Sequence, residues 1–86
     1  MQKKRPQSDW RVQIFVRLSG FDGAETLAVD LASMGATGNE VLLELHARGH
    51  SEVIGFFYGG VVVHLSTRLS DYSVVPGSTL FAITQT

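Results

Sequence analysis

Several features are missing from this chain of 86 residues, and each absence excludes a class of protein. There is no cysteine, which excludes a disulfide framework and a thiolate nucleophile, so packing alone must hold the core together. No apolar run approaches the roughly 20 residues that a membrane-spanning helix needs, and the Met1 end is charged rather than signal-like. We expect a soluble, intracellular protein with a single small core.

Motifs for catalysis and for metal or phosphate binding are also missing. Gly59-Gly60 lacks the lysine and the helix that follow a phosphate-binding loop, and no serine lies in a G-x-S-x-G segment. His46 and His50 are four residues apart, but no carboxylate or cysteine completes a set of metal ligands. We therefore predict no catalytic residue, no cofactor and no metal site.

The basic residues are concentrated at the start of the chain. Residues 1–11 hold four basic residues and one acidic residue, a net charge of +3, whereas residues 12–86 hold three basic and seven acidic residues, a net charge of −4. We interpret 1–11 as a basic extension and 12–86 as the folded domain. The extension is either a solvated, disordered segment or a contact for nucleic-acid phosphates or an import receptor. Its cations are Lys3, Lys4, Arg5 and Arg11.

Two segments near the front alternate between apolar and polar residues, which predicts strands. In 10–18, Val12, Ile14 and Val16 should face the core, with the residues between them on the other face. Ser19–Glu25 contains two glycines and an aspartate, so we expect a hairpin connection there, followed by a second strand over Thr26–Leu31.

The next segment carries the signals of a helix. Thr37-Gly38-Asn39-Glu40 has the pattern of a capping box, in which the Thr37 hydroxyl and the Glu40 carboxylate each accept a backbone N–H of the other residue. Val41, Leu42 and Leu45 supply an apolar face. Glu44 and Arg48 are four residues apart on the exposed side, and Gly49 is a suitable left-handed stop.

The last part of the chain predicts three short elements and a final strand. Residues 56–58 and 61–63 read as two strands joined by a tight turn at Gly59-Gly60. Leu69–Tyr72 suits a single helical turn, and Pro76-Gly77 suits a reversal. In the strand over Thr79–Thr84, Leu80 and Ala82 should lie on one face, with Phe81 and Ile83 on the other.

Two of these stretches carry a family resemblance. L-S-D-Y at Leu69–Tyr72, followed after a short loop by S-T-L, closely resembles the C-terminal third of ubiquitin, and Q-I-F-V at 13–16 is similar to its opening strand. The resemblance extends over 12–86. It implies an α+β fold of the β-grasp type, a mixed sheet of about five strands covered by one α-helix, with the first and last strands paired in parallel at the centre.

The resemblance also implies a docking surface on the sheet face away from the helix. Ubiquitin is recognised through an exposed apolar patch, and the matching positions here are Phe57, Phe81 and Ile83, with Leu18 as a fourth candidate. Apolar groups on a solvated sheet face otherwise need a cover. Either a protein partner docks there, or Trp10 or a fused neighbour covers the patch.

The end of the sequence departs from the family. Conjugation requires a C-terminal Gly-Gly, but this sequence ends Thr84-Gln85-Thr86, and both lysines lie in the basic extension. We therefore expect a non-conjugated monomer that is permanently fused ahead of a larger protein, such as a small-subunit ribosomal protein, and aids its folding or assembly. The alternative is the docking domain of a shuttle factor or ubiquitin-pathway enzyme that binds ubiquitin receptors or the proteasome.

These two readings set the expected partners and location. Both predict protein partners and no membrane, with nucleic acid met only indirectly or through the basic extension. We expect a cytoplasmic protein, associated with the ribosome if the fusion holds, and the nucleus stays open as an alternative.

Overall fold

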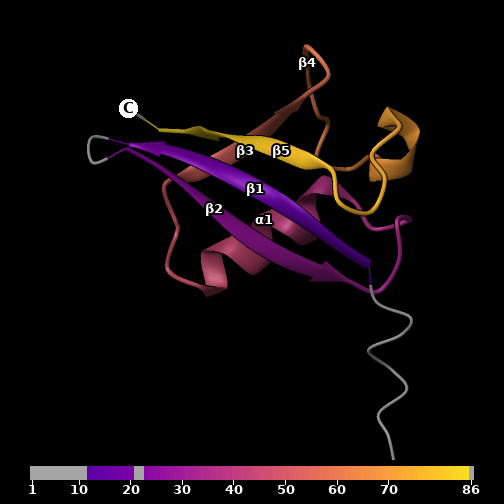
Figure 1. Cartoon of the computed structure of the whole chain (residues 1–86), viewed down its shortest axis with the longest axis horizontal. Helices are drawn as coiled ribbons and strands as arrows, with labels where there is room; N and C mark the ends of the chain where they lie inside the picture. The colour runs from indigo at the N-terminus through magenta and orange to yellow at the C-terminus, as the bar shows by residue number, and fades with distance from the viewer. Residues whose placement is uncertain (1–11, 21–22, 86) are drawn as a thin grey trace, which may run out of the picture.

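A computed structural model describes residues 12–20 and 23–85 of the chain. Within these residues, five strands, one α-helix and one 3-10 helix follow one another (Figure 1). In chain order they are β1 (Val12–Gly20), β2 (Gly23–Leu31), α1 (Gly38–Ala47), β3 (Val53–Tyr58), β4 (Val61–Val62), η2 (Leu69–Tyr72) and β5 (Thr79–Thr84). No helix among these residues is long and apolar enough to cross a membrane.

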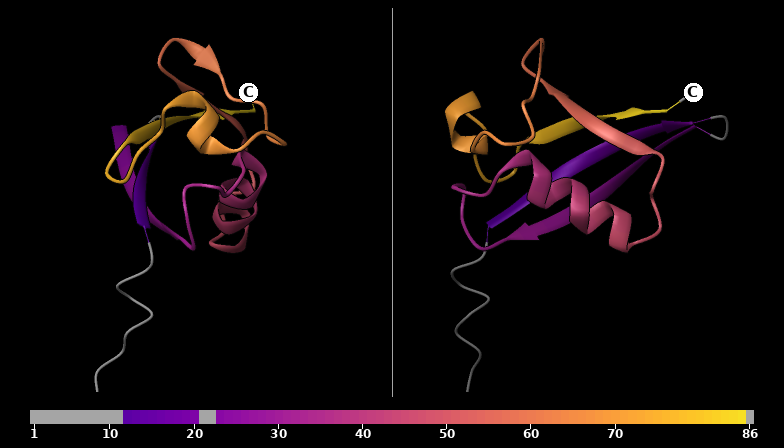
Figure 2. Two further views of the ribbon diagram at one scale, coloured as in Figure 1. Left: turned by 90° about the vertical axis from the view of Figure 1, so that its right-hand side faces the viewer. Right: turned by 180° about the vertical axis from the view of Figure 1, so that it is seen from behind.

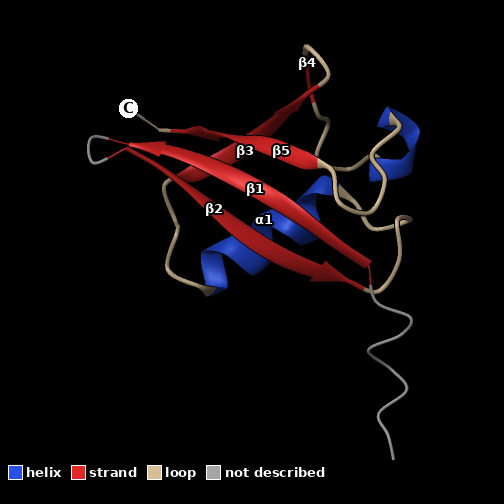
Figure 3. Ribbon diagram, viewed as in Figure 1, coloured by secondary structure: helices blue, strands red, loops and turns tan. Residues whose placement is uncertain are grey.

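The strands form one mixed sheet in the order β2-β1-β5-β3-β4, seen as red arrows in Figure 3. β1 and β5 pair in parallel, while the other neighbours pair antiparallel. A parallel pair requires a crossover connection, which here includes α1. The predicted β-grasp is confirmed, including the parallel pairing of the first and last strands within the sheet.

The helix lies against one face of the sheet and leaves the other face uncovered. Figure 1 looks onto the uncovered face, with α1 behind the strands, and the right-hand panel of Figure 2 shows α1 lying across the opposite face. The core lies between the two layers. Its fully buried side chains come from the sheet, from α1, from η2 and from the loops, and the largest are Phe56, Ile14, Leu45, Leu69, Leu80, Val16, Val29, Val41, Val53 and Val74.

The first turn of α1 is fixed by the capping box predicted at Thr37 and Glu40. The Glu40 backbone N–H donates to the Thr37 hydroxyl oxygen at 3.4 Å, and the Thr37 N–H donates to Glu40 Oε2 at 3.1 Å. The Glu40 N–H also donates to the Thr37 backbone carbonyl oxygen at 3.1 Å, so the two capping contacts add to the few backbone bonds that the first turn of a helix can make. After α1 ends, Gly49 adopts a φ of +98°, which is the left-handed stop that the sequence indicates.

Local turn chemistry sets the positions of the last strands. Gly59 and Gly60 have φ values of +62° and +85°, so the β3–β4 hairpin has the two-residue turn that matches strand twist. The turn pairs Tyr58 with Val61. Gly77 has a φ of +89°, and its N–H donates to Gln13 O at 2.8 Å, which places the start of β5 beside β1.

Three strands extend beyond the bounds that the sequence indicates. β1 and β2 stay in register as far as the pair of Gly20 and Gly23, so the expected connection over Ser19–Glu25 belongs mostly to the strands. Only positions 21 and 22 remain between them, and these lie outside the described residues. β3 begins at Val53 rather than at Phe56, because a register shift at 53–55 lets a glycine-containing stretch continue the ladder with β5.

Candidate protein-docking face

An apolar row crosses three strands on the helix-free face of the sheet. Phe57 of β3 lies directly opposite Phe81 of β5, and Val62 of β4 lies directly opposite Phe57. Residues directly opposite one another share a face, with Cβ atoms about 4.5–5.5 Å apart. Phe57 is 40% exposed, Phe81 49% and Val62 58%. Two aromatic rings and a branched side chain thus form one contiguous apolar surface, which we call the aromatic row.

On the side away from Val62, the residue next to the aromatic row is positively charged. Arg17 of β1 is the parallel-strand partner of Phe81, and it is also directly opposite Thr26 of β2. The Arg17 guanidinium donates from Nη1 to the Thr26 hydroxyl at 3.2 Å, which fixes where this side chain lies. The same face therefore passes from a polar end at Thr26 and Arg17 to an apolar end at Val62.

Ile83 faces the same side two residues beyond Phe81, but it is only partly exposed. It lies opposite Gly55, where an added Cβ would meet Ile83 Cδ1 at 3.8 Å. Beside it is an open pocket of about 610 Å³, lined mostly by apolar side chains. The residues of the pocket are Asn39, Ile54, Gly55, Val62, Val63, His64, Leu65, Ser66 and Ile83. Ile83 therefore lies between the aromatic row and this pocket, and it is less exposed than the two phenylalanines of the row.

The prediction that Leu18 belongs to the docking surface is wrong. Leu18 is 7% exposed and belongs to the core under the sheet. The reason is that β1 continues to Gly20, so the alternation that turns Ile14 and Val16 inward also turns Leu18 inward. The strand expected over 10–18 ended at Leu18, so we took this leucine to lie at the hairpin, where the alternation of the strand no longer fixes the face of a side chain.

Sequence reasoning also missed two members of the face. Val62 could have been assigned from the turn, because a two-residue loop at Gly59-Gly60 fixes Tyr58 opposite Val61 and hence Phe57 opposite Val62. Arg17 was placed on the outer face but not beside Phe81, since only the parallel register of β1 and β5 makes them neighbours.

The structure gives less support to a metal site or a nucleic-acid contact than to the aromatic row. Among the residues that the structure describes, no three histidine, aspartate or glutamate side chains gather as metal ligands would. His46 Nε2 lies 2.8 Å from the Val53 carbonyl oxygen, to which its N–H donates. The predicted nucleic-acid contacts Lys3, Lys4, Arg5 and Arg11 lie outside the described residues.

Comparison with known proteins agrees with the observed topology. The sequence matches no family model. No curated protein sequence gives a match either. Among solved structures, a protein designed de novo on the basis of ubiquitin superimposes with a TM-score of 0.70 and 26% sequence identity, over 90% of this chain and 92% of that one. This chain therefore resembles ubiquitin in its fold. Its helix, its 3-10 turn at Leu69–Tyr72 and its five-stranded mixed sheet are those of the ubiquitin-like β-grasp.

Proposed function

We propose that this ubiquitin-like domain is a non-catalytic docking module that binds protein partners through the aromatic row and Ile83. The observation that carries the proposal is the pairing of Phe57 with Phe81 on the face without a helix. Two neighbouring aromatic residues that are 40% and 49% exposed form the kind of anchor that dominates protein interfaces. The partner class that suits the resemblance is a ubiquitin receptor, such as a ubiquitin-interacting helix or a proteasomal receptor.

The surroundings of the row support an interface with a polar rim. Arg17 lies at one end, where a partner carboxylate could pair with it at the edge of a buried centre. At the other end the pocket beside Ile83 and Val62 could accept an apolar side chain. A partner helix with an apolar stripe and an acidic flank fits this order of groups.

The test is a titration of the ¹⁵N-labelled domain with a ubiquitin-interacting helix, followed by amide chemical shifts. We expect shifts to concentrate at Arg17, Phe57, Phe81 and Ile83, and Phe81→Ala to weaken binding about tenfold or more, as for an interface anchor. Leu43→Ala is the matched control, since Leu43 is an apolar residue on α1 that is 59% exposed, against 49% for Phe81, and it should bind as the unchanged domain does. Shifts centred on α1 would contradict the proposal.

A second candidate function concerns the larger polypeptide. We propose that the domain stays attached ahead of a basic protein, such as a small-subunit ribosomal protein, and aids its folding or assembly in the cytoplasm. The charge distribution favours this candidate, because residues 12–86 carry a net charge of −4 and no lysine that could be modified. The gene sequence after Thr86 and the mass of the cellular product test it, and a stop codon directly after Thr86 would exclude it.

A further inference from the structure

β2 is the longer of the two edge strands of the sheet. It spans Gly23–Leu31, and within residues 12–20 and 23–85 its single neighbour is β1, so its other side lies at the end of the described sheet. The opposite edge is formed by β4, which has only two residues. A long edge strand offers a row of backbone donors and acceptors to which another strand can pair.

The hydrogen bonds of β1 show which residues of β2 face outward. The Phe15 N–H donates to Ser78 O at 2.9 Å, and Gln13 O accepts from Gly77, so both β1 residues turn their backbone groups toward the β5 side. Their partners across the β1–β2 ladder are Ala28 and Asp30. In an antiparallel pair, the backbone N–H and C=O groups of two directly opposite residues either point toward each other or point away from each other. The backbone groups of Ala28 and Asp30 therefore point to the open edge.

The same alternation applies to the rest of the strand. Thr26 and Ala24 lie two and four residues before Ala28, so their N–H and C=O groups also face outward. These groups of Ala24, Thr26 and Asp30 make no hydrogen bond outside the ladder with another residue that the structure describes. Over most of the length of β2, the outward-facing backbone groups are thus available to pair with another strand.

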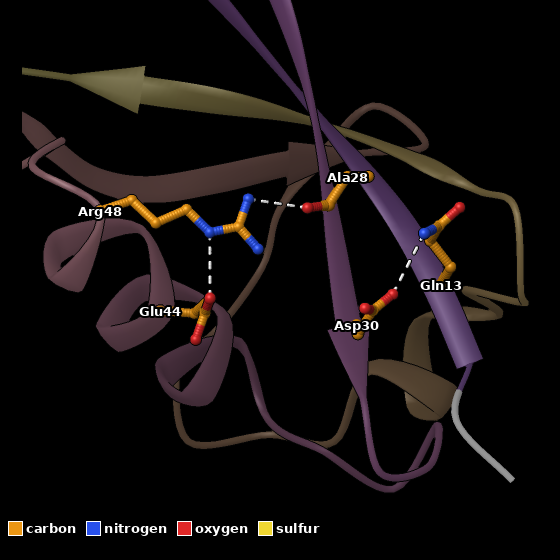
Figure 4. Close-up of polar contacts among 5 residues, drawn as sticks. All are labelled: Gln13, Ala28, Asp30, Glu44 and Arg48. Atoms are coloured by element: carbon orange, nitrogen blue, oxygen red, sulfur yellow. Dashed lines mark hydrogen bonds and ion pairs between the residues drawn. The ribbon is translucent and has the colours of Figure 1, made fainter. Parts of the chain in front are cut away.

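Ala28 is the exception, because its carbonyl oxygen already accepts a hydrogen bond from an arginine side chain at the end of α1. Arg48, just after α1, donates from Nη1 to Ala28 O at 2.8 Å and from Nε to Glu44 Oε2 at 3.0 Å (Figure 4). Glu44 lies one helical turn before Arg48 and holds the guanidinium in place. A further strand would have to lie about 4.8 Å from β2, in the space that the guanidinium fills.

We propose that β2 is a latent pairing edge for a second copy of this chain, and that Arg48, held by Glu44, keeps the edge closed. Antiparallel pairing of two β2 strands about a two-fold axis at Leu27 brings every outward-facing residue to a partner. Ala24 then lies opposite Asp30 of the second copy, and Thr26 lies opposite Ala28. No like charges meet, since Glu25 lies opposite Val29. The inference is independent of the docking proposal, because the aromatic row lies on the sheet face and the pairing groups lie at its edge.

Sedimentation velocity over a range of concentrations tests the proposal. Arg48→Ala should lower the dimer dissociation constant about tenfold or more, because in each of the two copies a charge-assisted hydrogen bond no longer competes for the Ala28 carbonyl. Glu44→Ala should shift association in the same direction but less, since Arg48 keeps its bond to Ala28 and loses only its tether. Arg68→Ala is the charge-matched control on another part of the surface and should leave the chain as monomeric as the unchanged protein.

A second substitution identifies the surface through which the Arg48 variant associates. The Ala28 N–H points outward, so Ala28→Pro removes an edge donor without removing a bond to β1. In the Arg48→Ala background this change should restore the monomer, and amide exchange at Thr26 and Asp30 should be slowed only while the dimer forms. An Arg48→Ala variant that stays monomeric, or a dimer that survives Ala28→Pro with fast exchange at Thr26, would overturn the proposal.

Discussion

Phe56 and Phe57 are consecutive residues of β3 with opposite surroundings. Phe56 is fully buried beneath the sheet, whereas Phe57 is 40% exposed on the other face. The residue type and the strand are the same, so only the direction in which the strand turns each side chain separates them. The sheet therefore has an inner face that holds the fold together and an outer face whose apolar groups contribute little to it. Stability and partner binding should respond to different substitutions.

The largest effect on stability should come from Phe56→Ala. Removing a fully buried aromatic side chain from the core should cost about 3–5 kcal/mol, which is a large share of the ~5–15 kcal/mol that typical domains have. Urea unfolding followed by circular dichroism measures it. Phe57→Ala is the control on the other face, and we expect a change within about 0.5 kcal/mol. If both variants lost the same free energy of unfolding, the two faces of the sheet would not differ in their contribution to stability.

Leu18→Ala tests the assignment of this residue to the inner face. Its side chain is 7% exposed, so its truncation should cost about 2–3 kcal/mol, the lower part of the range for buried leucines. The affinity of the folded fraction for a ubiquitin-interacting helix should not change. Weakened binding with an unchanged free energy of unfolding would show that Leu18 belongs to the docking face.

Thr37→Ala should have an intermediate effect, because it removes half of the capping box without changing either sheet face. Loss of the hydroxyl that accepts the Glu40 N–H should lower the free energy of unfolding by about 1 kcal/mol. Thr37→Ser retains the hydroxyl and should lose much less in the same urea experiment. If serine and alanine are equally destabilising, the hydroxyl does not stabilise the helix.

The smallest effect should come from the exposed side of α1. Glu44 and Arg48 form an ion pair with side chains 45% and 36% exposed, and such pairs contribute about 0.3–0.5 kcal/mol. Glu44→Ala should therefore lower stability only slightly, and added salt should reduce the difference. A loss above about 1 kcal/mol would mean that the Arg48 contact with Ala28 also stabilises the monomer through this tether.

Local signals in the sequence were enough for much of the fold. The capping box at Thr37 and Glu40, the glycine turn at Gly59-Gly60 and the stop at Gly49 each follow from the conformational preferences of a few neighbouring residues. The pairing of strands distant in sequence came from the resemblance of Leu69–Tyr72 and of the opening strand to ubiquitin, because periodicity alone does not choose between topologies.

The errors concern features that depend on distant residues or on where a strand ends. Leu18 was misplaced because strand ends are set by pairing, and β1 continues as long as β2 supplies partners. Placing Phe81 and Arg17 at neighbouring positions of one face required the parallel register of β1 and β5. The bond from Arg48 to Ala28 joins residues 20 positions apart and has no pattern in the sequence.

The most direct test of the two-faced sheet is the free energy of unfolding of a Phe57→Ala, Phe81→Ala double variant in urea. The account predicts a value within about 1 kcal/mol of the unchanged domain, because both rings lie on the solvated face. A loss of about 3 kcal/mol or more, comparable to that expected for Phe56→Ala, would show that the aromatic row holds the fold together and would contradict its role as a free docking surface.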